Sequence, residues 1–440
     1  MAFEPLPHGR RTGDRSVVTR SKNVWPWLIA GIGFVALVSA AGFRATPGAL
    51  VEPLRREFGW STGQISLAMS VNLALYGVTA PFASALMERF GVRRVTAAAM
   101  TLIALGSGLT VFMTAAWQLV LLWGVLVGLG AGSISLGFVA TIGTRWFVER
   151  QGLVTGILSA GGATGSLVFL PVVASLTQSP GGWRAAALVV AGTAVATVPL
   201  VLLFFRERPA DVGIPPFGGT EIVPAPRVRG NAAQIAAAAL GSASRTRTFW
   251  YLAAGFAICG ATTNGLVATH FIPAAHDHGM PQVTAAGLLA LIGVFDLVGT
   301  VASGWLSDRV DPRALLATYY LLRGLSLLVL PRLIGAEVTG PLVVFVVFYG
   351  LDFVATVPPT VALCRQHFGN SAAVVFGWVF AAHQIGAAVA ATAAGTARDA
   401  FGDYAPAWYA AGLLSVVAGV LSVRISRSRA PRLQPAPVPA

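Results

Sequence analysis

Charge is scarce in this sequence of 440 residues: charged residues make up 11% of it, and hydrophobic residues make up 55%. A soluble domain usually carries about 25% charged residues. A soluble chain of this length would need far more polar side chains to cover its surface, so the composition argues against a soluble protein. The net charge of +13 would suggest a nucleic-acid partner in a soluble protein. Here the basic residues fall between apolar runs, so they indicate which connections lie on which side of a membrane.

Cysteine and lysine are nearly absent, which limits the chemistry. Cys259 and Cys364 are the two cysteines, and they provide neither a disulfide framework nor a metal spacing. A nucleotide-binding P-loop needs a lysine after its glycines, and the single lysine is Lys22 in the leading polar segment. GLGAG at Gly128 lies inside an apolar run and indicates tight helix packing. We therefore expect no enzyme, no cofactor and no metal. The two histidines that flank an aspartate in HDHG at His276 could bind a metal, but we favour a solvated turn.

Long apolar runs recur along the chain. A helix rises about 1.5 Å per residue, so a run of about twenty residues crosses the roughly 30 Å hydrocarbon core of a bilayer. Small residues within the runs favour close helix packing. The predicted fold is an all-α membrane protein with twelve transmembrane helices in two six-helix bundles. The predicted helices are 25–52, 62–88, 95–115, 117–142, 152–177, 183–205, 248–273, 283–306, 313–333, 338–362, 371–397 and 404–424.

A stretch of about forty residues, first Pro-rich and then Ala-rich, separates the sixth and seventh predicted helices. This composition is typical of a linker. The predicted organisation is an N-terminal tail (1–24), a first bundle (25–205), a linker (206–247), a second bundle (248–424) and a C-terminal tail (425–440).

Arginines are distributed unequally between the two predicted sides of the membrane. Most arginines lie on one side, which holds the tails, the linker and alternate connections between the helices. The other side has only five arginines. The positive-inside rule therefore predicts that both termini and the linker are cytoplasmic, in a multi-pass protein of the cell membrane. The five exceptions are Arg55, Arg56, Arg184, Arg332 and Arg398.

The two halves also share a repeat at an offset of 220 residues. EFGWS in the first half corresponds to DHGMP in the second, and SALMERFGVRR corresponds to GWLSDRVDPR. Three matches at one offset indicate a duplicated unit. The aligned pairs are Glu57 with Asp277, Glu88 with Asp308, Arg89 with Arg309, and Arg145 with Arg365.

SALMERFGVRR resembles the signature loop of the major facilitator superfamily, which runs Gly, three residues, Asp-Arg, one residue, Gly, one residue and two basic residues. Ser84 and Glu88 replace the first glycine and the aspartate, whereas Gly304 and Asp308 keep them in the second half. With the predicted helices, linker and repeat, the resemblance covers nearly the entire chain. It implies alternating access to a midplane site. It also implies ion pairs that close the inner gate, formed by Glu88, Arg89, Asp308 and Arg309.

Two further segments, GFRATPGALVEPLRREFGWS and LIGVFDLVGTVASGWLSDR, resemble the monocarboxylate and oxalate/formate transporter group. That group has an aspartate in helix 8 and an arginine four residues later, used for proton coupling and anion binding. Asp296 fits the aspartate, but Thr300 stands at the arginine position. His383 occupies a place similar to that of the helix-11 lysine of oxalate-type members. The Gly-Pro signature of drug/proton antiporters is absent from GILSAGGATGSLVFLP.

Four charged residues lie inside the predicted spans: Arg44, Asp296, Arg323 and Asp352. Each costs at least about 2.5–3.5 kcal/mol at a helix centre, so each should face a partner or a watery cavity. We expect Arg44 to attract an anion, since guanidinium binds carboxylates bidentately, or else to bond a backbone carbonyl. Asp296 is either a proton carrier or one side of an ion pair with Arg323. Asp352 and Arg323 serve either proton coupling or structure.

Polar side chains at similar depth complete the predicted site. Tyr76 is the repeat counterpart of Asp296 and should face the same cavity, and Asn72 lies one turn earlier on the same face. Together with Arg44, the predicted substrate-binding residues are Asn72, Tyr76, Asn264, His270, His383 and Gln384.

These residues predict a secondary active transporter that moves a small organic anion, a mono- or dicarboxylate, by proton-coupled symport. Two alternatives stay open: a proton-antiport exporter of a hydrophobic compound, and a membrane sensor that does not transport. We expect a monomer whose partners are the solute, protons and lipid, without nucleic acid.

Overall fold

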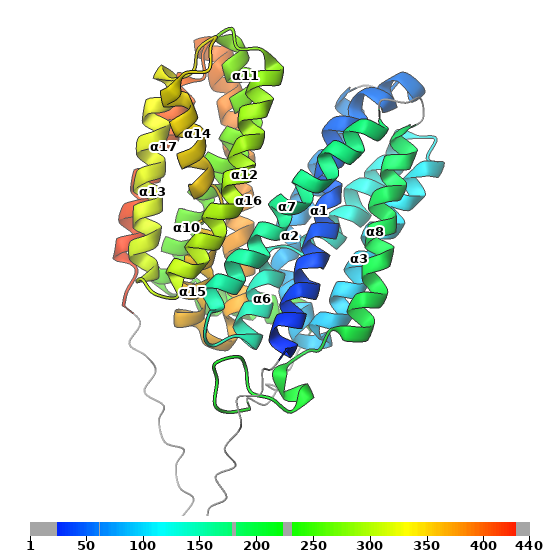
Figure 1. Ribbon diagram of the computed structural model, residues 1–440, viewed down its shortest axis with the longest axis vertical. Coiled ribbons are helices and arrows are strands. Elements are labelled where there is room, and N and C mark those ends of the chain that lie inside the picture. The colour runs from blue at the N-terminus through cyan, green and yellow to red at the C-terminus, as the bar shows by residue number, and fades with distance from the viewer. Residues whose placement is uncertain (1–23, 61, 178–181, 223–230, 428–440) are drawn as a thin grey trace, which may run out of the picture.

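The computed structural model describes residues 24–60, 62–177, 182–222 and 231–427 (Figure 1). It gives no side-chain description for residues 43–52, 62, 63, 66, 70, 170, 174, 282 and 399. The described residues form helices throughout, in two bundles, as predicted. The first bundle consists of α1 (Trp25–Phe58), α2 (Thr62–Phe90), α3 (Val92–Leu109), α4 (Ala116–Leu119), η2 (Val120–Val127), α5 (Gly128–Ser133), α6 (Leu136–Trp146), α7 (Gln151–Leu176) and α8 (Gly182–Phe204). The second consists of α10 (Arg247–Gly260), η4 (Ala261–Val267), α11 (Ala268–Asp277), α12 (Gln282–Ser307), α13 (Pro312–Val329), α14 (Gly340–Asp352), α15 (Val357–Phe368), α16 (Ala372–Phe401) and α17 (Ala405–Arg424).

Eleven helical runs in the described residues are long and apolar enough to cross a membrane. One of them, Gly340–Arg398, has 59 residues. At about 1.5 Å per residue it is long enough for two spans, and it contains α14 and α15 followed by α16. The twelve predicted helices are therefore present. The largest boundary differences are at α1, which continues to Phe58, and at α15, which continues to Phe368.

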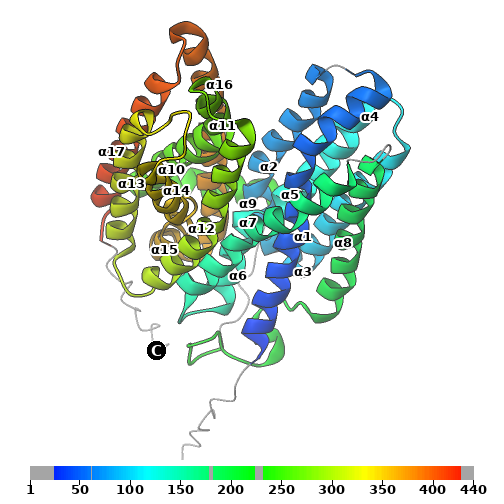
Figure 2. The ribbon, with the colours of Figure 1, turned by 45° about the horizontal axis from the view of Figure 1, so that its top comes forward.

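The two bundles form a V (Figures 1 and 2). They lie apart at one end and meet at the other, where the described linker residues 206–222 lie. Helices α7 and α12 make the main lateral contact between the bundles, and α2 packs on α16.

Glycines set the distances between the helices of the first bundle. A Cβ on Gly128 would lie 3.1 Å from the Asn72 Cα, and a Cβ on Gly132 would lie 3.0 Å from the Tyr76 Cα. Helix α5 thus packs directly against the backbone of α2, which small residues permit. The prediction that GLGAG is a packing motif is confirmed, and this packing fixes the position of Tyr76.

The linker contains a helix that its composition did not lead us to predict. Helix α9 (Ala232–Ala243) begins with a capping box, in which the side chains of Asn231 and Gln234 each accept from the other's backbone N–H. Alanine has the highest helix propensity, and the capping box satisfies exposed N–H groups. The Trp378 indole of α16 donates to the Ala236 carbonyl at 3.0 Å, which attaches α9 to the second bundle.

Candidate functional site

A cavity of about 460 Å³ lies between the two bundles. Its volume falls within the range of about 300–1,000 Å³ that is usual for small-molecule sites. Four of the predicted site residues line it: Tyr76 from α2, Asn264 from η4, Asp296 from α12 and His383 from α16. Tyr76 and Asp296, which the repeat aligns, thus face one cavity from opposite halves.

The Asp296 carboxylate is buried on the cavity wall and is held by neutral donors. Its Oδ1 accepts from the Thr300 hydroxyl at 2.8 Å and from the Val354 backbone N–H at 3.0 Å. Residues 353–356 separate α14 from α15, which begins with Pro358 and Pro359 at its second and third positions. This interruption leaves the Val354 N–H free for a side-chain acceptor.

Asp296 forms no ion pair with any described residue. The alternative in which it pairs with Arg323 is wrong, because Arg323 lies against the carboxylate that ends α14 instead. Asp296 can therefore change its charge without leaving a buried cation uncompensated.

Arg323 and Asp352 form a fully buried ion pair, with the Arg323 Nε 2.6 Å from the Asp352 Oδ2. The guanidinium also donates to the Asp352 carbonyl at 2.6 Å and to the Cys259 Sγ at 3.0 Å. Neither charged residue lines the central cavity. Of the two predicted roles for this pair, the geometry favours the structural one, and a part in proton coupling stays untested.

Two aromatic rings of the second half flank His383. Its ring lies 5.8 Å from the Phe380 ring at an interplanar angle of 21°, and 4.8 Å from the Phe256 ring. Tyr76 meets Phe380 edge to face at 5.6 Å. His383 and Tyr76 therefore present polar atoms within an otherwise aromatic part of the wall.

Three predicted binding residues lie outside the set that lines this cavity. The Asn72 amide donates to the Trp123 carbonyl at 2.8 Å, within the first bundle. His270 bonds the Ala391 carbonyl at 2.9 Å, and Gln384 packs against Gly77 of α2. Their sequence positions did not predict the rotation of each side chain about its helix.

Arg44 lies in α1, and its side chain is outside the described residues. Among the described cavity-lining residues there is no arginine and no lysine. The sequence did not single out Ser159 and Thr263, which also line the cavity. Hydroxyls of this kind are common in apolar helices, so they give no sequence signal.

Contacts between the halves close the end of the molecule that bears the linker. The Asp308 carboxylate accepts from the Gly152 N–H at 2.7 Å and from the Leu153 N–H at 3.0 Å. These are free N–H groups in the first turn of α7, where an anion is favourable. Arg365 donates to the Phe147 carbonyl at 3.1 Å and to the Gln151 side chain, which adds a second contact between the halves.

The other predicted gating residues have local partners. Glu88 pairs with Arg145 at 2.7 Å, within its own half, and with the linker residue Arg208 at 3.3 Å. The Arg89 guanidinium lies over the Phe90 ring, and that of Arg309 over the Trp305 ring. Among the predicted gating residues, Asp308 makes a contact across the halves in the described part of the chain.

One ridge of α12 connects the cavity to this closure. Residues four apart form a continuous ridge on a helix, and here Asp296, Thr300, Gly304 and Asp308 follow that spacing. A Cβ on Gly156 of α7 would lie 2.6 Å from the Thr300 carbonyl and 3.1 Å from the Gly304 Cα. The buried carboxylate and the carboxylate that binds α7 therefore stand at two ends of one tightly packed seam.

Known proteins resemble this chain over most of its length. The sequence profile of the Major Facilitator Superfamily matches residues 32–391. Monocarboxylate transporter 11 of Homo sapiens is 27% identical, over 97% of this chain and 86% of that protein. Monocarboxylate transporter 13 of Rattus norvegicus is 29% identical, over 90% of this chain and 88% of that protein.

Two solved structures have a similar fold. The fucose:proton symporter of E. coli matches with a TM-score of 0.66 at 17% identity, over 91% of this chain and 100% of that one. The proton:xylose symporter matches with a TM-score of 0.67 at 14% identity, over 91% and 96%. At these identities the likeness shows the fold alone.

Proposed function

We propose that this chain, which belongs to the Major Facilitator Superfamily and is a multi-pass membrane transporter, carries a small organic anion of the carboxylate class together with a proton. The single observation that carries the proposal is the Asp296 carboxylate, buried on the cavity wall between the halves and free of any ion pair with a described residue. The names of the relatives describe transporters and not enzymes, in agreement with the lack of a catalytic motif.

The seam between α7 and α12 offers a route from protonation to movement. A proton on Asp296 weakens its ability to accept from Thr300 and Val354, and these groups belong to the seam and to the interruption between α14 and α15. At the other end of the same ridge, Asp308 binds the first turn of α7. In our proposal, loading the cavity with solute and proton releases this contact, and the bundles then rock to open the opposite end.

The carboxylate class rests on two supports. The relatives are named for monocarboxylates. In addition, His383 lines the cavity, and an imidazole N–H can donate to an anion. Arg44 is our proposed second binder, since its position in α1 places it in the outer half of a helix that lines the cavity. Both termini and the linker are assigned to the cytoplasm by the positive-inside rule, so the cavity opens outward.

Uptake into proteoliposomes tests the coupling. With a radiolabelled monocarboxylate such as lactate, an inwardly directed proton gradient should drive accumulation by the unmodified chain. Asp296→Asn should abolish accumulation while keeping exchange of labelled for unlabelled solute, because binding and rocking survive without the titrating proton. Asp277→Asn removes a carboxylate of an exposed ion pair and serves as the control. If Asp296→Asn accumulates solute like the control, the coupling assignment is wrong.

The substrate class needs a separate measurement. Small carboxylates should raise the melting temperature of the purified chain, since a ligand that binds the folded protein stabilises it by mass action. Uncharged amides of the same acids are the matched ligands. Equal shifts from acids and amides would contradict the carboxylate assignment and leave the coupling result unaffected.

Export of a hydrophobic compound by proton antiport is the second candidate, and the apolar cavity wall favours it. Leu37, Leu289 and Phe380 line the cavity, and the described lining holds no permanent cation. External acidification separates the two functions: it should speed carboxylate uptake by a symporter, whereas an exporter should lower the cell content of its compound.

A further inference from the structure

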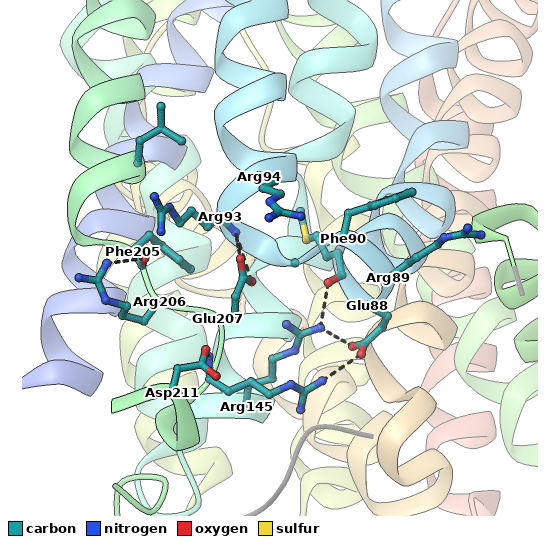
Figure 3. A pocket seen from close by; sticks show the side chains of 14 residues that line it. Glu88, Arg89, Phe90, Arg93, Arg94, Arg145, Phe205, Arg206, Glu207 and Asp211 are labelled. Carbon is teal, nitrogen blue, oxygen red and sulfur yellow. Dashed lines mark hydrogen bonds and ion pairs between the residues drawn. The ribbon is translucent and has the colours of Figure 1, made fainter. Parts of the chain in front are cut away.

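A second cavity, of about 660 Å³, lies at the linker end of the first bundle (Figure 3). Six arginines are among the residues that line it, and they come from α2, α3, α6 and the linker. The arginines are Arg89, Arg93, Arg94, Arg145, Arg206 and Arg208, and the carboxylates are Glu88, Glu207 and Asp211.

The carboxylates leave positive charge uncompensated. Glu88 is shared by two guanidinium groups, those of Arg145 and Arg208. Asp211 accepts from the Arg208 backbone N–H instead of a guanidinium. The pKa of Arg208 is lowered, first by burial and then by the nearby Arg145 charge. The cavity therefore has room and charge for a further anion.

Two features show where that anion would bind. The side chain of Arg145 is 7% exposed, and its Nε has no hydrogen-bond partner in the described part of the chain. The side chains of Arg93 and Arg94 make no hydrogen bond or ion pair with any described residue. These donors come from two separate elements, α3 and α6, and line the same cavity.

The chain's own carboxylate already occupies part of this position. Glu207 accepts from the backbone N–H groups of Val92 and Arg93 in the first turn of α3 (Figure 3). Burial raises the pKa of Glu207, so its charged form is held there at a desolvation cost. A helix N-terminus with adjacent arginines suits the oxygens of a phosphate group.

The rim of the cavity is apolar. Phe90 is 48% exposed, Leu203 64% and Phe204 47%, and these residues adjoin the lining at the ends of α2 and α8. These residues end membrane-spanning helices, so an acyl chain can lie against them while a headgroup enters the cavity.

From these observations we infer that the cavity binds the phosphate of an anionic phospholipid, with Arg93, Arg94 and Arg145 as donors and Glu207 as an internal competitor. The site is separate from the transported solute and goes beyond the proposed function. Binding displaces Glu207 from α3 and loosens the start of the linker.

The test uses the full chain in detergent and dihexanoyl phosphatidylglycerol, dihexanoyl phosphatidylcholine and inorganic phosphate as probes. Phosphatidylglycerol should bind most tightly. Arg93→Gln/Arg94→Gln should weaken its binding by about tenfold or more, since two charge-assisted contacts are lost. Arg309→Gln/Arg332→Gln removes the same charge elsewhere and should leave binding unchanged. Glu207→Gln should tighten binding, because the competing carboxylate is gone.

Equal binding of phosphatidylglycerol and phosphatidylcholine would overturn the inference, as would equal affinities in the Arg93/Arg94 variant and its control. Inorganic phosphate that binds as tightly as the lipid would overturn the lipid as the source of the phosphate. Size-exclusion elution and the melting temperature without ligand establish that each variant is folded. Should the double variant fail to fold, Glu207→Gln decides the matter, and weaker or unchanged binding there contradicts the competition.

Discussion

Breaking the Arg323–Asp352 ion pair should unfold the second bundle more readily than any surface change. Arg323 is fully buried, and its guanidinium donates to the carboxylate, to two backbone carbonyls and to the Cys259 thiol. In Asp352→Ala this guanidinium stays buried without a countercharge. Loss of one partner of a buried pair costs about 3–5 kcal/mol, so we expect a destabilisation of that size.

Arg323→Met should destabilise the protein by a similar amount, because here the buried carboxylate loses its partner. The Asp352 Oδ1 has no hydrogen-bond partner among the described residues, so loss of Arg323 leaves both carboxylate oxygens unsatisfied. The double variant Arg323→Met/Asp352→Leu removes both charges and keeps most of the volume. Its loss in the free energy of unfolding should be smaller, by at least about 2 kcal/mol, than the sum of the losses in the two single variants.

Unfolding of the purified protein in mixed micelles, followed by tryptophan fluorescence, measures all three variants. A double-mutant cycle on the exposed pair formed by Arg398 and Asp277 is the matched control. The coupling energy of that pair should be about 0.2–1 kcal/mol. Two results would refute this account of the buried pair. One is that Asp352→Ala destabilises the protein no more than Asp277→Ala. The other is that the losses of stability in the two buried single variants add up to the loss in the double variant. Proton-driven uptake that survives in the double variant would place the pair in structure and not in coupling.

Two smaller predictions concern the ends of the bundles. Asp308→Asn should favour opening at the linker end by about 1 kcal/mol, the usual effect of losing a helix cap. Labelling of a cysteine placed at Ser307, which is buried beside Gly152, should then quicken; unchanged labelling, or the same gain in Arg309→Gln, would contradict this. Hydrogen bonds from Arg184 and then Trp183 hold the pKa of Glu57 below its ordinary 4.5. The contribution of Glu57 to the free energy of unfolding is therefore complete above pH 4.5, and it is lost as the pH falls through the lowered pKa. Glu57→Gln should therefore lower the free energy of unfolding by less than about 1 kcal/mol at pH 7, and unfolding at descending pH should show that difference shrink.

Much of the site could be predicted because charge inside a membrane is costly. Asp296, Asp352 and Arg323 stood out for this reason alone, and the repeat placed Tyr76 opposite Asp296. The partners could not be predicted in the same way. Asn72 and His270 were expected in the cavity, but each bonds a backbone carbonyl of a neighbouring helix.

The sequence by itself determined that the chain crosses a membrane in two similar halves and which helices hold buried charge, because chain length, hydropathy and desolvation are local properties. The tertiary structure alone decided that Arg323 belongs to Asp352, that Asp296 is left to neutral donors, and that Asp308 binds the first turn of α7. Those outcomes depend on the rotation of each helix about its axis and on the interruption between α14 and α15. Both are set by packing between segments far apart in the chain, which no local pattern encodes.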